Sequence, residues 1–328
     1  MELREFTADD VDDVRRFVDL SNAVSKVDSP WGHPATVSDY QGQLRHGWDG
    51  EPQTPFLALV DGEAVGQGEY STSEWDNRHL AWLWVAVHPD RRRQGLGTRI
   101  LDALIARARA EGRTSVGIDG WESEGTRAFA ARHGLDLKSQ DLNRRQHLSE
   151  LEWESVRAIR DAAAVEAADY EVVRRLGATP DEELEALSEM TAAINDAPTD
   201  DLDIEDEVFP AERVHHYESA QLARGFRFHR VFARHRETRQ LAGHTVVVVD
   251  GERPHLAEQH DTSVVRAHRG HRLGLLLKAD MMLWLHETQP QVESIDTWNA
   301  ESNDHMIDVN EQLGYRIMGR ALAFQRSI

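Results

Sequence analysis

The feature that most limits how this chain can fold is an internal repeat with a constant spacing along the sequence. The matched residues of the two repeats are Val65-Gly66 with Ala242-Gly243, Gly97 with Gly274, Asp119 with Asp296, Trp121 with Trp298 and Glu124 with Glu301. A single shared glycine would mean little, but several identities in one register and one order indicate a duplicated unit. The length of 328 residues also leaves room for two domains of roughly 150 residues each. We therefore expect two copies of one fold.

Both copies alternate segments of strand and helix periodicity, which predicts a mixed α/β fold class, α+β with a mixed sheet, for each. The clearest predicted elements are, in the first copy, a strand at 80–87, a helix at 95–111 and a strand at 115–119, and in the second copy a strand at 255–265, a helix at 272–286 and a strand at 294–298. We expect a first domain at 1–150, a helical connector at 151–169 and a second domain at 170–328.

Composition excludes several classes of protein. The chain has 58 acidic and 37 basic residues and a formal net charge of -21, which would repel nucleic acid. No apolar run approaches the ~20 residues of a membrane span, and the first residues do not have the pattern of a signal peptide, so we expect a cytoplasmic protein with no membrane partner. There is no cysteine, so disulfides, thiolate metal sites and an acyl-cysteine intermediate are absent. The dispersed histidines predict no metal site.

The first copy carries a loop suited to binding phosphate. The run from Arg91 to Thr98 includes three arginines and two glycines, Gly95 and Gly97, and lies between an apolar strand and the start of a helix. Unpaired backbone N–H groups and the positive end of the helix dipole meet there. Glycines let phosphate oxygens approach the backbone and arginines add charge, so the loop is a candidate pyrophosphate site. It has neither the lysine of a Walker loop nor the three glycines of a dinucleotide loop.

The second copy has a variant of this loop, from Arg269 to Leu275. Arg272 stands at the position of Gly95, whereas Gly274 keeps the position of Gly97. Because any residue contributes a backbone N–H, phosphate binding remains possible, and Gly270 could supply the room that Arg272 removes.

The spacing Arg92-x-x-Gly95-x-Gly97 after an apolar strand resembles the acetyl-coenzyme A loop of the GNAT superfamily of N-acetyltransferases, and the tandem arrangement is similar to mycothiol synthase and other actinobacterial double GNAT proteins. The resemblance implies two tandem GNAT folds, acetyl-CoA as co-substrate and an amine acceptor. The cofactor-binding residues that it implies are Val85, Val87, Arg92, Arg93, Gln94, Gly95, Gly97, Thr98, Val264, Arg269, Gly270, His271, Arg272, Gly274, Leu275 and Asn303.

Catalysis is expected in the second copy. The base of related histone acetyltransferases lies fourteen residues before the first glycine of the loop, which is Ala81 in the first copy and Glu258 in the second. Strand alternation predicts that Glu258, His260, Thr262 and Val264 share one face. Glu258 and His260 are therefore the candidate catalytic residues. The tyrosine acid of many relatives is absent from both copies, which have Ala130 and Asn310 at its place.

The acceptor remains open. A small-molecule amine is the leading prediction, and a protein lysine acetyltransferase or a non-catalytic acyl-CoA-binding protein are the alternatives. The segment from Thr199 to Glu207 is rich in carboxylates, and we expect it to lie on the acceptor side of the second copy, where it could attract a cationic amine. The oligomeric state cannot be predicted from these features.

Overall fold

The computed structural model describes residues 1–328, which form two units, each with a run of six neighbouring strands. Unit 1 contains residues 1–141, 199–206 and 319–328. Unit 2 contains residues 142–198 and 207–318. Both are mixed α/β units, so the predicted fold class is confirmed.

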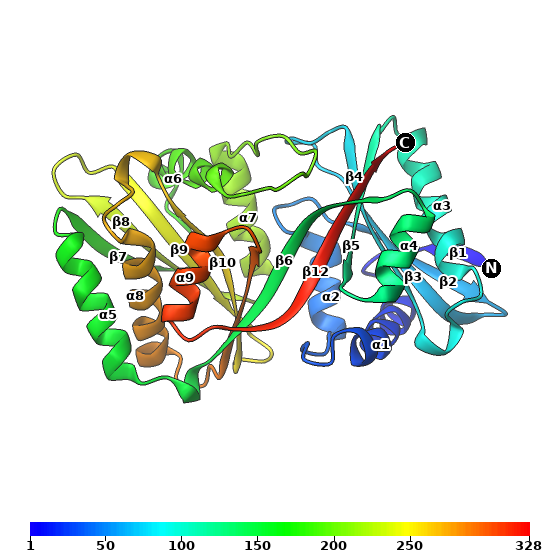
Figure 1. Cartoon of the computed structure of the whole chain (residues 1–328), viewed down its shortest axis with the longest axis horizontal. Helices are drawn as coiled ribbons and strands as arrows, with labels where there is room; N and C mark the ends of the chain where they lie inside the picture. Colours follow the sequence, from blue (N-terminus) through cyan, green and yellow to red (C-terminus); the bar gives the residue numbers. More distant parts are fainter. The chain divides into compact units, whose positions relative to one another are not determined.

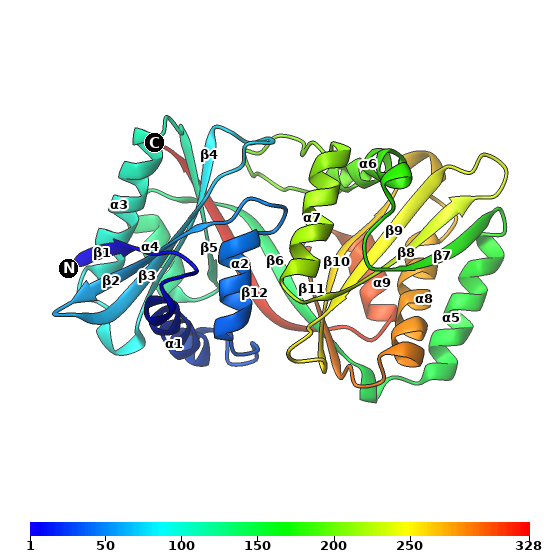
Figure 2. The ribbon, with the colours of Figure 1, turned by 180° about the vertical axis from the view of Figure 1, so that it is seen from behind.

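In unit 1 the strand order is β1-β2-β3-β4-β5-β12. The strands are β1 (Glu2–Glu5), β2 (Thr54–Val60), β3 (Glu63–Ser71), β4 (Leu80–Val87), β5 (Ser115–Trp121) and β12 (Arg316–Ser327). The helices are α1 (Val11–Asp28), α2 (Val37–His46), the 3-10 turn η1 (Pro89–Arg91), α3 (Leu96–Ala110) and α4 (Glu124–Arg132). Helices α3 and α4 cover one face of this sheet (Figure 1), and α1 and α2 cover the other (Figure 2).

In unit 2 the strand order is β6-β11-β10-β9-β8-β7. The strands are β6 (Asp136–His147), β7 (Tyr170–Leu176), β8 (Arg227–His235), β9 (Leu241–Val249), β10 (Leu256–Val264) and β11 (Ser294–Ala300). The helices are α5 (Trp153–Glu166), α6 (Leu184–Thr191), α7 (Ala211–Ala223), α8 (Leu273–Thr288) and α9 (Asp304–Gln312), with 3-10 turns η2 (Leu148–Glu150), η3 (Asp181–Glu183), η4 (Ala192–Asp196) and η5 (Arg266–His268). Helices α6 and α7 lie on the face of the sheet opposite to α5 and α8 (Figure 2).

The two repeats exchange their last strands. Strand β12, at the end of the second repeat, pairs with β5 of unit 1 from Ala321, opposite Trp121, to Ser327, opposite Ser115. Strand β6, at the end of the first repeat, neighbours β11 of unit 2, and Arg145 of β6 holds Asp296 of β11 by two hydrogen bonds of 2.6 and 2.8 Å. The compact units are therefore not continuous stretches of sequence.

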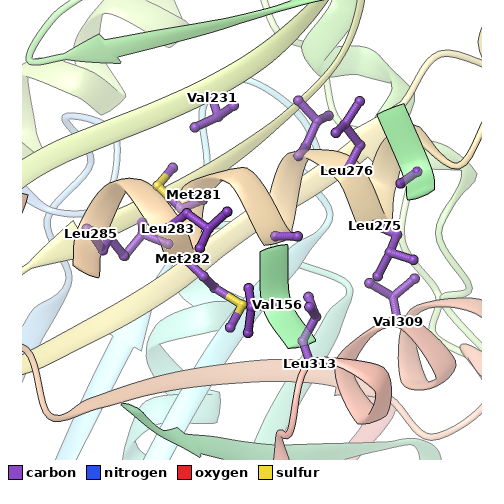
Figure 3. Packing of buried hydrophobic residues seen from close by; sticks show 14 of the residues in the cluster. Val156, Val231, Leu275, Leu276, Met281, Met282, Leu283, Leu285, Val309 and Leu313 are labelled. Carbon is purple, nitrogen blue, oxygen red and sulfur yellow. The ribbon is translucent and has the colours of Figure 1, made fainter. Parts of the chain in front are cut away.

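Helix α8 forms the centre of the core of unit 2. All residues of α8 from Leu273 to Leu283 are buried, including the charged Lys278 and Asp280, so the helix is surrounded by protein on all sides over this length. Figure 3 shows its side chains between Val231 of β8 and Val156 of α5, with Val309 of α9 close by. The segment predicted as a connector thus forms a helix, α5, whose apolar face belongs to the core of unit 2. None of the helices combines the length and the apolar character that a membrane crossing requires.

In each unit two adjacent parallel strands pair over only part of their length. Strand β4 pairs with β5 from Leu80 to Leu83, and β10 pairs with β11 from Leu256 to Glu258. Beyond these residues the parallel strands no longer pair. The second half of β4 leads into the loop before α3, and the second half of β10 leads into the loop before α8. The open end between β10 and β11 is where the candidate site of unit 2 lies.

Strand β10 contains an extra residue that β4 lacks. Gln259 pairs with Val247 of β9, but Thr262 pairs with Thr245, so two residues, His260 and Asp261, oppose one on β9. Such a bulge reverses the alternation of side chains beyond it. Glu258 and His260 therefore share a face, but Thr262 and Val264 lie on the opposite face, with Gln259. The prediction that all four residues share one face was wrong for this reason.

Candidate active site

A cavity of about 770 Å³ opens in unit 2 beyond the last paired residues of β10 and β11. Its wall combines the end of β10, the loop before α8, the first turn of α8, one face of α9, and η4 with the two residues after it. The lining residues are Ala193, Ile194, Asp196, Ala197, Pro198, Thr262, Ser263, Val264, Arg269, Gly270, Arg272, Leu273, Gly274, Leu275, Ser302, Asn303, Asp304, His305, Met306, Asp308, Val309 and Gln312. This volume lies within the range of small-molecule and cofactor sites.

Most of the cofactor residues predicted in the second copy line this one cavity. They are Val264, Arg269, Gly270, Arg272, Gly274, Leu275 and Asn303. The remaining one, His271, packs its ring 5.4 Å from that of Tyr170 instead. The side chain of Asn303 caps α9 by accepting a hydrogen bond of 3.2 Å from the backbone N–H of Met306.

The loops before α3 and α8 have the same backbone shape with glycine and arginine exchanged. The first has Arg93 at φ 64° and Gly95 at φ 78°, and the second has Gly270 at φ 87° and Arg272 at φ 54°. Each loop thus places the N-cap of the helix, and the residue two positions before it, in the left-handed region. A side chain costs roughly 1–2 kcal/mol in that conformation. Arg272 therefore keeps the backbone shape of the phosphate loop, at the cost of local strain.

One arginine of each loop is held away from the helix terminus by an ion pair. Arg92 donates to the carbonyl of Val87 at 3.2 Å and to both oxygens of Asp28 at 2.9 and 2.6 Å. Arg269 repeats this arrangement, with 3.0 Å to the carbonyl of Val264 and 2.7 Å to Asp196. Arg92 joins the end of β4 to the last residue of α1, and Arg269 joins the end of β10 to the last residue of η4. Their guanidinium groups therefore serve the shape of the loop.

Arg272 is the loop cation of unit 2 that makes no hydrogen bond or ion pair. Its side chain is exposed, and it lines the cavity. It stands at the N-terminus of α8, where the first N–H groups of the helix have no partner within the helix. An unpaired guanidinium beside these donors is suited to an anionic phosphate.

In the first copy, less space is open beside the first turn of α3 than beside the first turn of α8 in the second copy. A Cβ atom at Gly97 would lie 3.3 Å from the ring of Phe129 on α4, whereas a Cβ atom at Gly274 would meet nothing within 4 Å. The hydroxyl of Thr98 also lies 3.1 Å from the Nε2 atom of His133. These contacts join α3 to α4 where the second copy has its cavity. The other predicted residues of this copy are exposed, as Arg93, Gln94 and Gly95, or pack against the core under α3, as Val85 and Val87.

The predicted catalytic pair forms a polar chain on the side of β10 that faces α7. The Nε2 atom of His260 lies 3.8 Å from Oε2 of Glu258, and its Nδ1 atom lies 2.6 Å from the hydroxyl of Tyr217 on α7. The side chain of Glu258 is 63% exposed, and that of His260 is buried. Desolvation acts to raise the pKa of Glu258, but the attraction of His260 and of two nearby arginines outweighs it and lowers the pKa. Glu258 is therefore a carboxylate at neutral pH, able to accept a proton.

Neither Glu258 nor His260 lines the cavity. Ser263, which does line it, lies on the same face of β10 as Glu258. The bulge also changes the comparison of the two copies, because Glu258 pairs with Val248 of β9 and the equivalent pair in unit 1 is Trp82 with Ser71. The residue of the first copy that occupies the place of Glu258 is therefore Trp82 and not Ala81.

The sequence and the fold both match known acetyltransferases. Residues 23–135 match the sequence model of the acetyltransferase (GNAT) family. The whole chain is similar in structure to a tandem GNAT protein from the clavulanic acid biosynthesis pathway, with a TM-score of 0.80, 26% identity, and coverage of 99% of this chain and 98% of that one. The first repeat thus matches the GNAT family model, and the whole chain has the fold of two GNAT domains in tandem.

Two further structures share the fold of this chain. A GCN5-related N-acetyltransferase from Sphaerobacter thermophilus has a TM-score of 0.68 at 15% identity, with 99% of this chain and 95% of that chain covered. The glucosamine N-acetyltransferase region of a fungal multi-domain β-N-acetylglucosaminidase has a TM-score of 0.67 at 12% identity, with 99% and 38% covered. A search of curated proteins finds no match. Together, the family-model match and the tandem GNAT structure support N-acetyltransferase activity with an acyl-coenzyme A as donor.

The acidic segment is placed differently from the sequence prediction. Residues 199–206 belong to unit 1. The backbone N–H of Glu205 donates to Asn77 at 2.7 Å, and the N–H of Asp203 donates to Gln325 at 2.7 Å. Most of this segment therefore packs with unit 1, and a role for it beside an acceptor stays a prediction. Sequence reasoning also missed Tyr217, because nothing in the sequence of α7 indicates that its hydroxyl reaches β10.

Proposed function

We propose that this GNAT protein transfers the acetyl group of acetyl-CoA to the amine of a small molecule, with both substrates bound in unit 2. The observation that carries the proposal is the cavity of about 770 Å³ whose wall is built from the variant phosphate loop of the second copy. A cavity formed by the loop that resembles a cofactor motif is the natural place for that cofactor.

The phosphate groups have a defined place in this proposal. The free N–H groups of the first turn of α8 and the unpaired guanidinium of Arg272 would hold the pyrophosphate. The open space above Gly274 leaves room for the chain of coenzyme A to pass between α8 and α9. The amide of Asn303 at the start of α9 would contact the cofactor from the other side.

The chemistry requires an amine to attack the thioester carbon. As the new C–N bond forms and the C–S bond breaks, the amine must lose a proton and the thiolate of coenzyme A must leave. Glu258 is the proposed base, and His260, held between Tyr217 and Glu258, stabilises its carboxylate. Because Glu258 is exposed, an acceptor that arrives from solvent can reach it directly. The family relative from the clavulanic acid pathway supports a small-molecule acceptor.

A calorimetric titration with acetyl-CoA tests the position of the cofactor. Gly274→Leu would place a side chain in open space in the second copy, and Gly97→Leu is its matched control in the first. We expect Gly274→Leu to abolish binding and Gly97→Leu to leave it unchanged. If Gly97→Leu abolishes binding and Gly274→Leu leaves it unchanged, the cofactor site lies in the first copy instead.

A thiol-release assay with a panel of amines tests the base. Once an acceptor is found, Glu258→Gln should lower turnover by roughly 10²- to 10⁴-fold and leave the affinity for acetyl-CoA nearly intact. Full turnover of this variant would exclude Glu258 as the base.

A further inference from the structure

A chain of buried polar side chains leads from the core of unit 2 to the wall of the cavity. It begins at Lys278 on α8, which is 2% exposed and has no carboxylate partner. Its single hydrogen bond is a donation of 3.2 Å to Oε1 of Gln259 on β10, and its ammonium lies 5.0 Å from the ring of Tyr315. Burial of this ammonium lowers the pKa of Lys278 to about 7. Such a group is costly to bury and needs an explanation.

The chain continues across two strands. Nε2 of Gln259 donates to Oγ1 of Thr245 at 3.0 Å and to the carbonyl of Val246 at 2.6 Å. The hydroxyl of Thr245 then lies 2.7 Å from that of Thr262, which lines the cavity. The bulge makes this alignment possible, because the extra residue turns Thr262 to the same face of β10 as Gln259.

The ammonium of Lys278 and the carbonyl of Val246 together fix the orientation of the Gln259 amide, and with it the direction of the hydrogen bonds in the chain. A charged lysine only donates, so Gln259 must present its oxygen to Lys278 and its amide nitrogen to Thr245. Thr245, which accepts from Gln259, has one hydrogen of its own and only Thr262 as a further partner, so it donates to Thr262. The hydroxyl hydrogen of Thr262 then has no acceptor within the protein and is free for a ligand in the cavity.

The first copy shows that the fold does not need this chain. The residues in the equivalent positions are all apolar or lack a side chain: Leu101 for Lys278, Leu83 for Gln259, Gly68 for Thr245 and Val85 for Thr262. Both copies form the same sheet and helix, so a polar chain in the second copy alone indicates a role beyond folding.

We propose that Thr262 donates a hydrogen bond to a carbonyl oxygen of the acyl-coenzyme A bound in this cavity, and that Lys278 is a positioning residue that directs this donation through Gln259 and Thr245. The inference rests on the proposed function, since it requires the cofactor in unit 2. Acyl-CoA offers two kinds of carbonyl, that of the thioester and those of the amides in its pantetheine arm. Thr262 is then a residue that recognises the acyl donor, distinct from the base Glu258.

The test is a set of titrations with acetyl-CoA. Thr262→Val removes the hydroxyl and keeps the shape, and should weaken binding by about three- to tenfold, the effect of one neutral hydrogen bond. Thr262→Ser restores the donor and should restore affinity. Lys278→Met should weaken binding as well, and the double variant Thr262→Val with Lys278→Met should bind no more weakly than Thr262→Val alone, because Lys278 acts through Thr262.

S-ethyl-coenzyme A, a thioether without the thioester carbonyl, identifies the acceptor atom. If Thr262→Val weakens acetyl-CoA but not the thioether, the acceptor is the thioester, and if it weakens both, the acceptor is an amide of the pantetheine arm. Unchanged affinity of Thr262→Val for acetyl-CoA would overturn the inference, and additive losses in the double variant would overturn the role of Lys278. Failure of the proposed function is a different result, in which Gly274→Leu leaves binding intact.

Discussion

Replacing the buried Lys278 by methionine should make unit 2 more stable at neutral and low pH. The pKa of Lys278 falls from 10.5 to about 7 in the folded protein. Each pKa unit corresponds to about 1.4 kcal/mol, so burial of the ammonium costs up to about 5 kcal/mol below pH 7. The substitution also leaves Oε1 of Gln259 without its donor, which costs about 1–3 kcal/mol. We therefore expect a net gain of about 2–4 kcal/mol at pH 6.5.

The sign of the pH dependence follows from the direction of the shift. Between pH 7 and pH 10.5 the unfolded chain carries a proton on Lys278 that the folded protein has released, so wild-type stability rises with pH in this window. The advantage of Lys278→Met should thus shrink by about 3 kcal/mol between pH 6.5 and pH 9.5. This change can be measured by denaturant titrations at both pH values, with hydrogen exchange of the α8 amides as the readout for unit 2. The exposed Lys26 on α1 provides a matched control, Lys26→Met. An advantage that is equal at the two pH values would refute the reasoning.

Three further predictions concern other parts of the chain. Burial raises the pKa of Glu69 to about 7, so the folded protein keeps a proton on Glu69 between pH 4.5 and 7 and loses stability as pH rises through this window. In denaturant titrations, Glu69→Gln should be up to about 3 kcal/mol more stable than wild type at pH 8 and equal to it at pH 4. Asn77→Ala removes the side-chain hydrogen bonds to Glu205 and should speed hydrogen exchange of residues 199–206 more than ten-fold, which corresponds to a loss of about 1.4 kcal/mol or more in local stability. Asn77→Gly should show the same effect without backbone strain, because glycine suits the φ of 48° at this position. Asp196→Asn weakens the ion pairs with Arg266 and Arg269 and should speed hydrogen exchange in the loop before α8, whereas the midpoint of global denaturant unfolding should change little because the pairs are partly exposed.

The sequence predicted the parts of the fold that depend on local pattern. The duplication was visible because glycines and the Asp-x-Trp run recur at one spacing, and the phosphate loops were visible because their arginines and glycines stand next to each other. The structure adds that Arg92 and Arg269 are held in ion pairs, since the carboxylates of Asp28 and Asp196 come from distant segments. No local pattern could indicate such partners.

The rest of the site depends on features that leave no local signature. The bulge at His260 and Asp261 inserts one residue with ordinary side chains, and it shifts the comparison of Glu258 from Ala81 to Trp82. In the sequence, Lys278 is a single polar residue within an apolar helix. The hydrogen bonds that link it to the cavity form only when β9 and β10 are paired. Strand alternation is reliable only where the ladder has no irregularity.

The exchange of β6 and β12 has a consequence for how this protein is made. Unit 1 includes the first 141 residues together with residues 319–328. In this unit β5 pairs with β12, whose Ser327 lies opposite Ser115. Synthesis proceeds from the N-terminus, so unit 1 must wait with the edge of β5 unpaired until residues 319–328 have been added. Unit 2, which needs nothing beyond residue 318, can close earlier, although synthesis of its residues starts later. An unpaired strand edge promotes association between chains, so this waiting period is the stage at which newly made chains are most prone to exchange strands with one another.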